Sequence, residues 1–293
     1  MTARELAPAA VAAVNGILVG SAMVATRVVV HQTGPASLAL LRYAIGFCCL
    51  LPVVLVARRV RFEWRDVVPI ALLGIAQFGI LIALLNVCLA YIPSARAALI
   101  FAVFPLLTML LSAALGRERL TPAKSGGVLL TIAGVGMALG EKALERGAIG
   151  EAWIGELAVF ASALCGATCS VLYKPYLKKY PTLPVSAFAM LASVVFLAAL
   201  AAREGFFAAA PPFSTVGWLA VLFIGANSGV GYFLWLWALN HAPATQVTVF
   251  LSLSPVTAAL LGAVLLDEPL SSGALAALAC VVLGLWLAHR DPR

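Results

Sequence analysis

The sequence predicts an all-α membrane protein with ten transmembrane helices in a 5+5 inverted-topology repeat. Three observations support this prediction. The chain is 63% hydrophobic and only 11% charged, whereas soluble domains are about 25% charged. Apolar stretches of about 20 residues, the length that crosses ~30 Å of hydrocarbon, recur along the chain. Residues 85–140 are also matched, without a gap, by a second copy 150 positions later.

The apolar stretches are expected to be helices because a chain in lipid must satisfy its own backbone hydrogen bonds. They are near-continuous runs of Ala, Leu, Val and Gly, which differ from the period-two alternation of a membrane β-barrel. In chain order they are 7–30, 38–57, 67–90, 94–115, 123–140, 152–173, 184–202, 215–239, 243–266 and 271–289.

The first five helices are predicted to form one repeat, residues 1–145. The first helix follows a single basic residue, Arg4, and the repeat requires it, so we do not expect a cleaved signal peptide. The third helix has Gln77 near its middle, and the fourth has Pro105 at its midpoint. The polar run 141–151 marks the boundary with the second repeat.

Residues 146–293 are predicted to form the second repeat. Asn227 in the eighth helix corresponds to Gln77, and Pro255 in the ninth corresponds to Pro105. A proline inside a helix removes one backbone hydrogen bond and kinks the helix. The paired prolines therefore predict either a hinge or a bowl-shaped cavity.

Two GxxxG pairs, Gly16 with Gly20 and Gly225 with Gly229, lie in the first and eighth helices. Such pairs allow helices to approach closely. Close packing is one interpretation of them, and a flexible gating helix is the other.

Basic residues predict the orientation of the chain. With loops numbered alternately from the N-terminus, thirteen of the nineteen Lys and Arg residues fall on one side and three on the other. The positive-inside rule then places both termini in the cytoplasm. Because each repeat has five helices, the two repeats run in opposite directions. This bias also explains the net charge of +7, so no nucleic-acid partner is implied.

The remaining three basic residues, Arg27, Arg42 and Arg96, lie inside predicted helices and toward the extracytoplasmic face. Snorkelling of these long side chains to the interface is one explanation. A positive outer vestibule that holds a carboxylate-bearing solute is the other.

Groups that catalysis or ion coupling would need are missing at membrane depth. All twelve carboxylates and the three histidines lie near helix ends or in loops, and only Glu156 intrudes, by about one turn. There is no HExxH motif, carboxylate pair or Walker A sequence. Cys165 and Cys169 have no His or acidic neighbour. We therefore expect no enzyme activity, no cofactor and no metal.

Uncharged polar residues and aromatic rings remain at depth. The repeat-related amides Gln77 and Asn227 can either bond neighbouring helices or line a cavity. Aromatic residues cluster in the third, fourth and eighth helices, including Phe104. Aromatic walls suit a ring, and a few amides fix its orientation. The predicted substrate site, between the halves, comprises Asn15, Gln77, Phe78, Ile82, Phe101, Pro105, Thr168, Asn227, Tyr232, Trp235, Thr248 and Pro255.

Several stretches resemble the paired signature of the drug/metabolite transporter superfamily, EamA type. They are Glu118-Arg-Leu-Thr, Gly126-Gly127, Gly134-Val135, Glu268-Pro-Leu-Ser, Gly284 and Leu41-Arg42-Tyr43. The resemblance covers essentially the whole chain, which within the family resembles the bacterial exporters of aromatic amino acids. It implies ten helices, an inverted repeat, metabolite export and a place in the bacterial inner membrane. These are packing and loop motifs, so they specify the fold better than the substrate.

The predicted function is export of aromatic and other apolar amino acids through a central cavity, with weak discrimination among rings. One alternative is export of other small metabolites or drugs. A second is a sugar-nucleotide or phosphate carrier, which would favour Lys or Arg at the midplane, where the sequence places none. A third is a membrane scaffold, which needs no symmetric amides. The expected partners are small solutes and lipid. Transport direction, coupling ion and oligomeric state stay open, and a monomer is compatible with the sequence.

Overall fold

The computed structural model describes residues 3–56, 60–117, 152–208 and 211–267, with isolated positions within 121–137 and 275–287. In these residues the secondary structure is helical, and eight helical runs are long and apolar enough to cross a membrane. They match eight of the ten predicted helices. The predicted helices 123–140 and 271–289 lie mostly outside the described residues, and so does the 141–151 boundary.

The helices follow the predicted order. In the first repeat they are α1 (Ala3–Val29), α2 (Pro35–Val56), α3 (Trp64–Gly74), the π-helical turn η1 (Ile75–Ile80), α4 (Leu81–Tyr91), α5 (Ser94–Phe101) and α6 (Phe104–Ala114). In the second repeat they are α8 (Ala152–Leu172), α9 (Lys174–Lys179), α10 (Thr182–Arg203), α11 (Thr215–His241), α12 (Ala244–Val249), the 3-10 turn η2 (Phe250–Ser252) and α13 (Leu253–Leu266).

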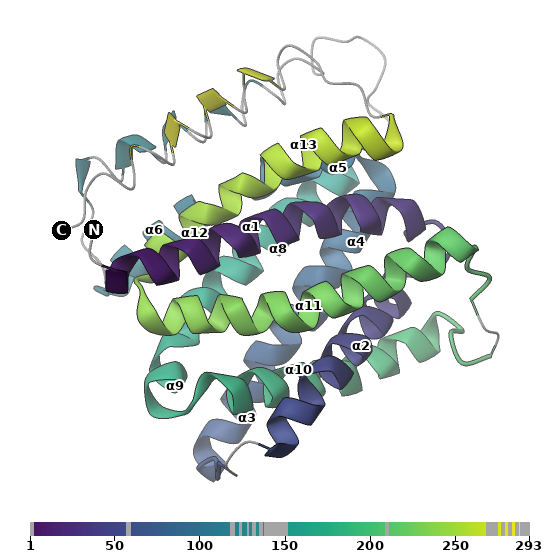
Figure 1. Cartoon of the computed structure of the whole chain (residues 1–293), viewed down its shortest axis with the longest axis horizontal. Coiled ribbons are helices and arrows are strands. Elements are labelled where there is room, and N and C mark those ends of the chain that lie inside the picture. The colour runs from purple at the N-terminus through teal and green to yellow at the C-terminus, as the bar shows by residue number, and fades with distance from the viewer. Residues whose placement is uncertain are drawn as a thin grey trace.

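The two repeats interlock through reciprocal contacts. Helix α1 packs against α11 and α13, as Figure 1 shows, while its counterpart α8 packs against α4 and α6. In the same way α2 contacts α11 and α3 contacts α10, and α2 and α10 pack directly on each other. When each helix makes the same contacts with the opposite repeat as its counterpart does, the two repeats are related by an internal two-fold axis. The space at that axis is therefore lined by both halves of the chain.

Glycines set the closest helix crossings. A Cβ atom on Gly16 would lie 2.2 Å from the carbonyl oxygen of Phe250, so α1 directly contacts the backbone that joins α12 to α13. A Cβ atom on Gly229 would lie 2.6 Å from the carbonyl oxygen of Gly46, at the crossing of α11 and α2. Both predicted GxxxG pairs therefore serve close packing.

Pro105 and Pro255 interrupt their helices at equivalent positions. Helix α5 ends at Phe101, and α6 begins at Phe104 with Pro105 in its first turn. The turn η2 precedes Pro255 in the same way. Proline lacks an N–H and clashes with the carbonyl four residues earlier. The predicted kinks are confirmed, and they lie beside the cavity described below.

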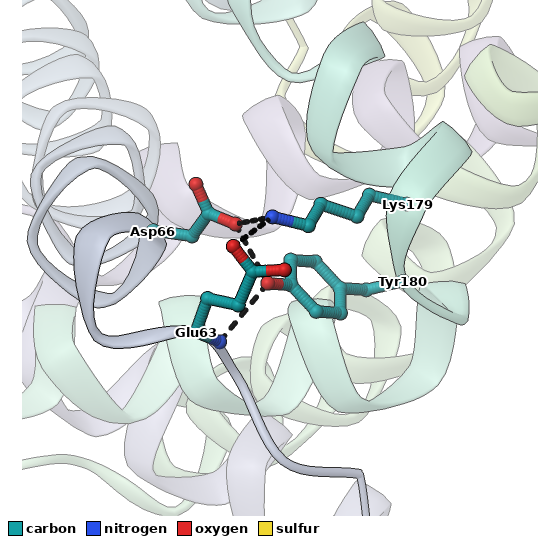
Figure 2. A network of polar contacts seen from close by, with 4 residues as sticks. All are labelled: Glu63, Asp66, Lys179 and Tyr180. Atoms are coloured by element: carbon teal, nitrogen blue, oxygen red, sulfur yellow. Dashed lines mark hydrogen bonds and ion pairs between the residues drawn. The ribbon is translucent and has the colours of Figure 1, made fainter.

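At one end of the bundle, a polar cluster joins the start of α3 to the end of α9 (Figure 2). Lys179 Nζ lies 2.6 Å from both Glu63 Oε2 and Asp66 Oδ2. The Tyr180 hydroxyl donates to Asp66 Oδ2 at 2.6 Å and accepts from the Glu63 N–H at 3.0 Å. The Lys179 and Glu63 side chains are 41% and 62% exposed, so water screens this pair. The cluster therefore joins the two repeats through contacts that are partly exposed to solvent.

At the other end of α10, Glu204 caps α2 of the opposite repeat. Its Oε1 accepts from the Ala36 N–H at 3.0 Å, and its Oε2 accepts from the Ser37 N–H at 2.8 Å and the Ser37 hydroxyl at 2.6 Å. The first N–H groups of a helix have no partner within the helix, and a carboxylate satisfies them. Glu204 thus fixes the end of α2 that leads to the cavity.

Candidate functional site

A cavity of about 100 Å³ lies between the two repeats. Its walls come from α1, α2, η1, α4, α5, α6, α11 and η2. Most of its lining is apolar or aromatic, with a few polar side chains, which is typical of small-molecule sites. Such sites usually enclose ~300–1,000 Å³. A solute with an aromatic ring therefore requires the walls to move apart.

Eight of the twelve predicted site residues line this cavity. They are Asn15, Gln77, Phe78, Ile82, Phe101, Asn227, Tyr232 and Trp235. They come from five different helical elements, brought together because α1 and α11 cross beside the broken run of α5 and α6.

The other four predicted residues, Pro105, Thr168, Thr248 and Pro255, lie outside the cavity wall. Both prolines are buried and shape the helix breaks. The Thr168 hydroxyl donates to the Leu164 carbonyl at 2.9 Å. Thr248 is fully buried, and its hydroxyl donates to the Thr245 carbonyl at 3.2 Å. Each of these hydroxyls donates to its own helix backbone, and neither threonine is among the residues that line the cavity, so the predicted polar lining was too large.

Aromatic rings from both repeats line the cavity in two edge-on groups. The Phe78 ring centroid lies 4.7 Å from that of Tyr43 and 4.0 Å from that of Tyr232, edge-on in both cases. Phe104 lies edge-on to Trp235 at 6.0 Å. Edge-to-face geometry is favourable for aromatic pairs. Tyr43 and Phe104 were not among the predicted site residues, although the Leu41-Arg42-Tyr43 motif had singled out Tyr43.

The two repeat-related amides have different surroundings. Asn227 Nδ2 donates to the Leu18 carbonyl at 2.8 Å, so this side chain helps to join α11 to α1. Its Oδ1 remains an acceptor: a Cβ atom on Gly231 would lie 3.5 Å from it and 3.1 Å from Asn15 Oδ1. Gln77 lies in the π-helical turn, and its buried Oε1 has no hydrogen-bond partner among the described residues. Such turns often mark functional sites.

Arg42 is the one charged side chain in the cavity lining given by the described residues. It is only 8% exposed, and its Nε donates to Ser228 Oγ. By contrast, Arg27 donates to the Leu89 carbonyl, and Arg96 pairs with Glu156. Snorkelling therefore does not describe Arg42. Although the sequence places Arg42 near a helix start and leaves the midplane without Lys or Arg, this side chain lines the cavity between the repeats.

A second, basic cavity of about 510 Å³ lies near the ends of α8 and α11. Arg117 Nη1 donates to the Val171 carbonyl, and Lys174 Nζ donates to the Ala242 carbonyl at 2.9 Å. Helix C-termini carry partial negative charge and attract cations. These basic residues thus have a structural role in capping helix ends.

Similar proteins were found in sequence and in structure. The probable terminal-alkyne amino-acid exporter of Streptantibioticus cattleyicolor is 30% identical over 274 residues, 92% of this chain and 89% of that protein. The aromatic amino acid exporter YddG of Ancylobacter novellus is 31% identical over 195 residues, 66% of this chain and 65% of that protein. One protein of known crystal structure, 26% identical, has a TM-score of 0.73, with 95% of this chain and 98% of that one covered.

Residues 7–140 and 153–290 each match the EamA-like transporter family. Two matches in one chain, together with the reciprocal helix contacts, confirm the predicted all-α membrane fold with its 5+5 inverted repeat. The relatives are transporters and not enzymes, as the missing catalytic groups predicted. The chain therefore belongs to the EamA-like transporter family.

Proposed function

We propose that this protein exports aromatic and other apolar amino acids through the cavity between its repeats. The observation that carries the proposal is the aromatic wall formed by Tyr43, Phe78, Tyr232, Phe104 and Trp235. Rings bury a large apolar area and stack edge-on against other rings. The amino-acid exporters among the relatives support the same substrate class.

In this proposal the cavity residues divide into two groups. Phe78, Phe101, Tyr232 and Trp235 cover the side chain of the solute, and Ile82 extends the apolar surface. The amides Asn15, Gln77 and Asn227 orient its polar end. Discrimination among rings is weak, because differences of this size in an apolar pocket are worth only ~1–3 kcal/mol. Phe, Trp, Tyr, Met and Leu are all expected as substrates.

The test is transport by purified protein in proteoliposomes, with a panel of amino acids and with or without a proton gradient. We expect uptake of Phe, Trp and Tyr above empty liposomes, and weaker uptake of charged amino acids. A sugar nucleotide is included in the panel as a second solute, to test the alternative carrier function. Transport of the nucleotide without transport of any amino acid would refute the proposal.

The proposed location is the bacterial inner membrane, with both termini in the cytoplasm and the repeats meeting at residues 145 and 146. Single cysteines at Lys142 and Lys178, in a variant without the native cysteines, test the orientation. An impermeant thiol reagent added from outside is expected to label position 142 and not position 178. Equal labelling of both positions contradicts the ten-helix topology.

A further inference from the structure

We infer that the site recognises a zwitterion: Arg42 binds the carboxylate of the solute, and amide oxygens of the same cavity bind the ammonium. This inference rests on the proposed function and specifies which atoms of an amino acid are recognised. It predicts that an amine or an ester with the same ring is a poor substrate.

The first step concerns the burial of Arg42. A buried charge is costly unless it is paired or fully hydrogen-bonded. No Asp or Glu side chain lies within salt-bridge distance of Arg42 in the part of the chain that the structure describes. The residue is 8% exposed, and among the described residues its polar and π contacts are the Ser228 hydroxyl and the Tyr43 ring. Among the described residues, Arg42 is therefore a buried cation without a carboxylate partner.

The second step concerns the geometry of the guanidinium group. A guanidinium has five N–H donors, and the contact with Ser228 uses the one on Nε. Ser228 Oγ in turn donates to the Ile224 carbonyl at 2.6 Å, which fixes the serine. None of the described residues accepts a hydrogen bond from the two Nη groups. These groups form the planar fork that binds a carboxylate with two parallel hydrogen bonds.

The third step concerns the other polar atoms of the cavity. Gln77 Oε1 is buried without a partner, and Asn227 is oriented by its bond to Leu18 so that Oδ1 remains an acceptor. Asn15 Oδ1 approaches the same glycine, Gly231, as Asn227 Oδ1. An ammonium group has three donors and no acceptor. Neutral amide oxygens can accept hydrogen bonds from this ammonium group. A carboxylate in their place would pair with Arg42 and neutralise it.

Charge balance selects the solute class. One cation with no acidic partner matches one carboxylate, whereas a nucleotide diphosphate brings more negative charge than this lining can balance. A hydrogen bond to a charged group contributes about 1.5–3 kcal/mol. Loss of the carboxylate from the solute is therefore expected to weaken transport at least ~10-fold.

The test compares phenylalanine with phenethylamine, which lacks the carboxylate, in proteoliposomes. Wild type is expected to transport phenylalanine at least ~10-fold more efficiently. Arg42→Gln is expected to raise the KM for phenylalanine about 10-fold and leave phenethylamine unchanged, so that the preference is lost. Arg42→Lys keeps part of the preference, because its ammonium pairs with a carboxylate as a point charge. Arg96→Gln, a matched control outside the cavity, leaves the preference unchanged.

Monodispersity on size exclusion establishes that each variant is folded. Equal transport of both solutes by wild type overturns the inference, even if Arg42→Gln cannot be purified. An unchanged preference in folded Arg42→Gln overturns it as well, while amino-acid export itself would stand. If wild type transports no amino acid, the proposed function fails and this inference fails with it.

Discussion

The two amides at equivalent positions of the repeats are expected to respond differently to the same substitution. Asn227 Nδ2 bonds the α1 backbone at the Leu18 carbonyl, whereas Gln77 Oε1 has no partner among the described residues. Leucine branches as asparagine does, is larger than both amides, and cannot form their hydrogen bonds. Asn227→Leu therefore removes an interhelical bond, and Gln77→Leu removes only a cavity acceptor.

The magnitude follows from the number of bonds lost. Interhelical hydrogen bonds in membrane proteins contribute about 0.6 kcal/mol on average and about 1.7 kcal/mol at most. Asn227→Leu breaks one such bond, so we expect it to cost about 1 kcal/mol. Gln77→Leu breaks none. It removes a buried oxygen without a partner, and burying such an unpaired oxygen is unfavourable in the wild type. Its stability is expected to equal or slightly exceed that of wild type, while phenylalanine transport falls.

The assay pairs thermal unfolding in one detergent with transport in proteoliposomes. We expect a lower Tm for Asn227→Leu, and an unchanged Tm with reduced transport for Gln77→Leu. If Gln77→Leu loses as much stability as Asn227→Leu, helix packing is the role of both amides. If Gln77→Leu transports normally and is stable, the cavity does not use this residue.

Three further substitutions test the packing and the coupling. Gly74→Ala places a Cβ atom 2.2 Å from the Ala189 carbonyl oxygen, so α3 and α10 must separate and the Tm is expected to fall. Gly126→Ala is the control: its Cβ atom has its nearest contact at 3.4 Å, and the Tm is expected to stay unchanged. Glu204→Gln weakens the cap on α2, and thermal unfolding should report a loss of about 0.5–2 kcal/mol. Glu156→Gln is expected to leave downhill transport in proteoliposomes largely intact, because this carboxylate pairs with Arg96 outside the cavity; complete loss of transport in folded protein would assign it a coupling role.

The architecture was largely predictable because membrane insertion imposes a length and a composition on each helix. Eight predicted helices agree with the structure to within a few residues. Two local features escaped prediction. The π-helical turn at Ile75–Ile80 has no equivalent in α11, although the sequences are related by the repeat. The short helix Lys174–Lys179 is too polar and too brief to give an apolar signal.

The cavity was only partly predictable, for reasons of side-chain reach and hydrogen bonding. Gln77, Asn227 and the rings were found because they lie near helix midpoints. A positive vestibule was one of two explanations for Arg42, but the predicted site did not include this residue, because sequence position locates its Cα atom near a helix start and does not reveal where a long side chain extends. Thr168 and Thr248 were predicted to line the cavity and are not among its lining residues, because sequence position does not show which face of a helix meets the cavity.

The packing of the repeats is symmetric, but the chemistry of the cavity is not. Each repeat contributes the same reciprocal helix contacts and a proline break. Yet among the described residues the cation of the cavity comes from α2 alone, and only one of the two equivalent amides lies in a π-helical turn. A symmetric pocket would offer the same groups to both ends of a solute and could not fix its orientation. An amino acid has a negative and a positive group on one carbon, so a site that binds it in one orientation must break the symmetry of its scaffold. The difference between Gln77 and Asn227, and the arginine that lines the cavity with them, are the kind of asymmetry that such a solute requires.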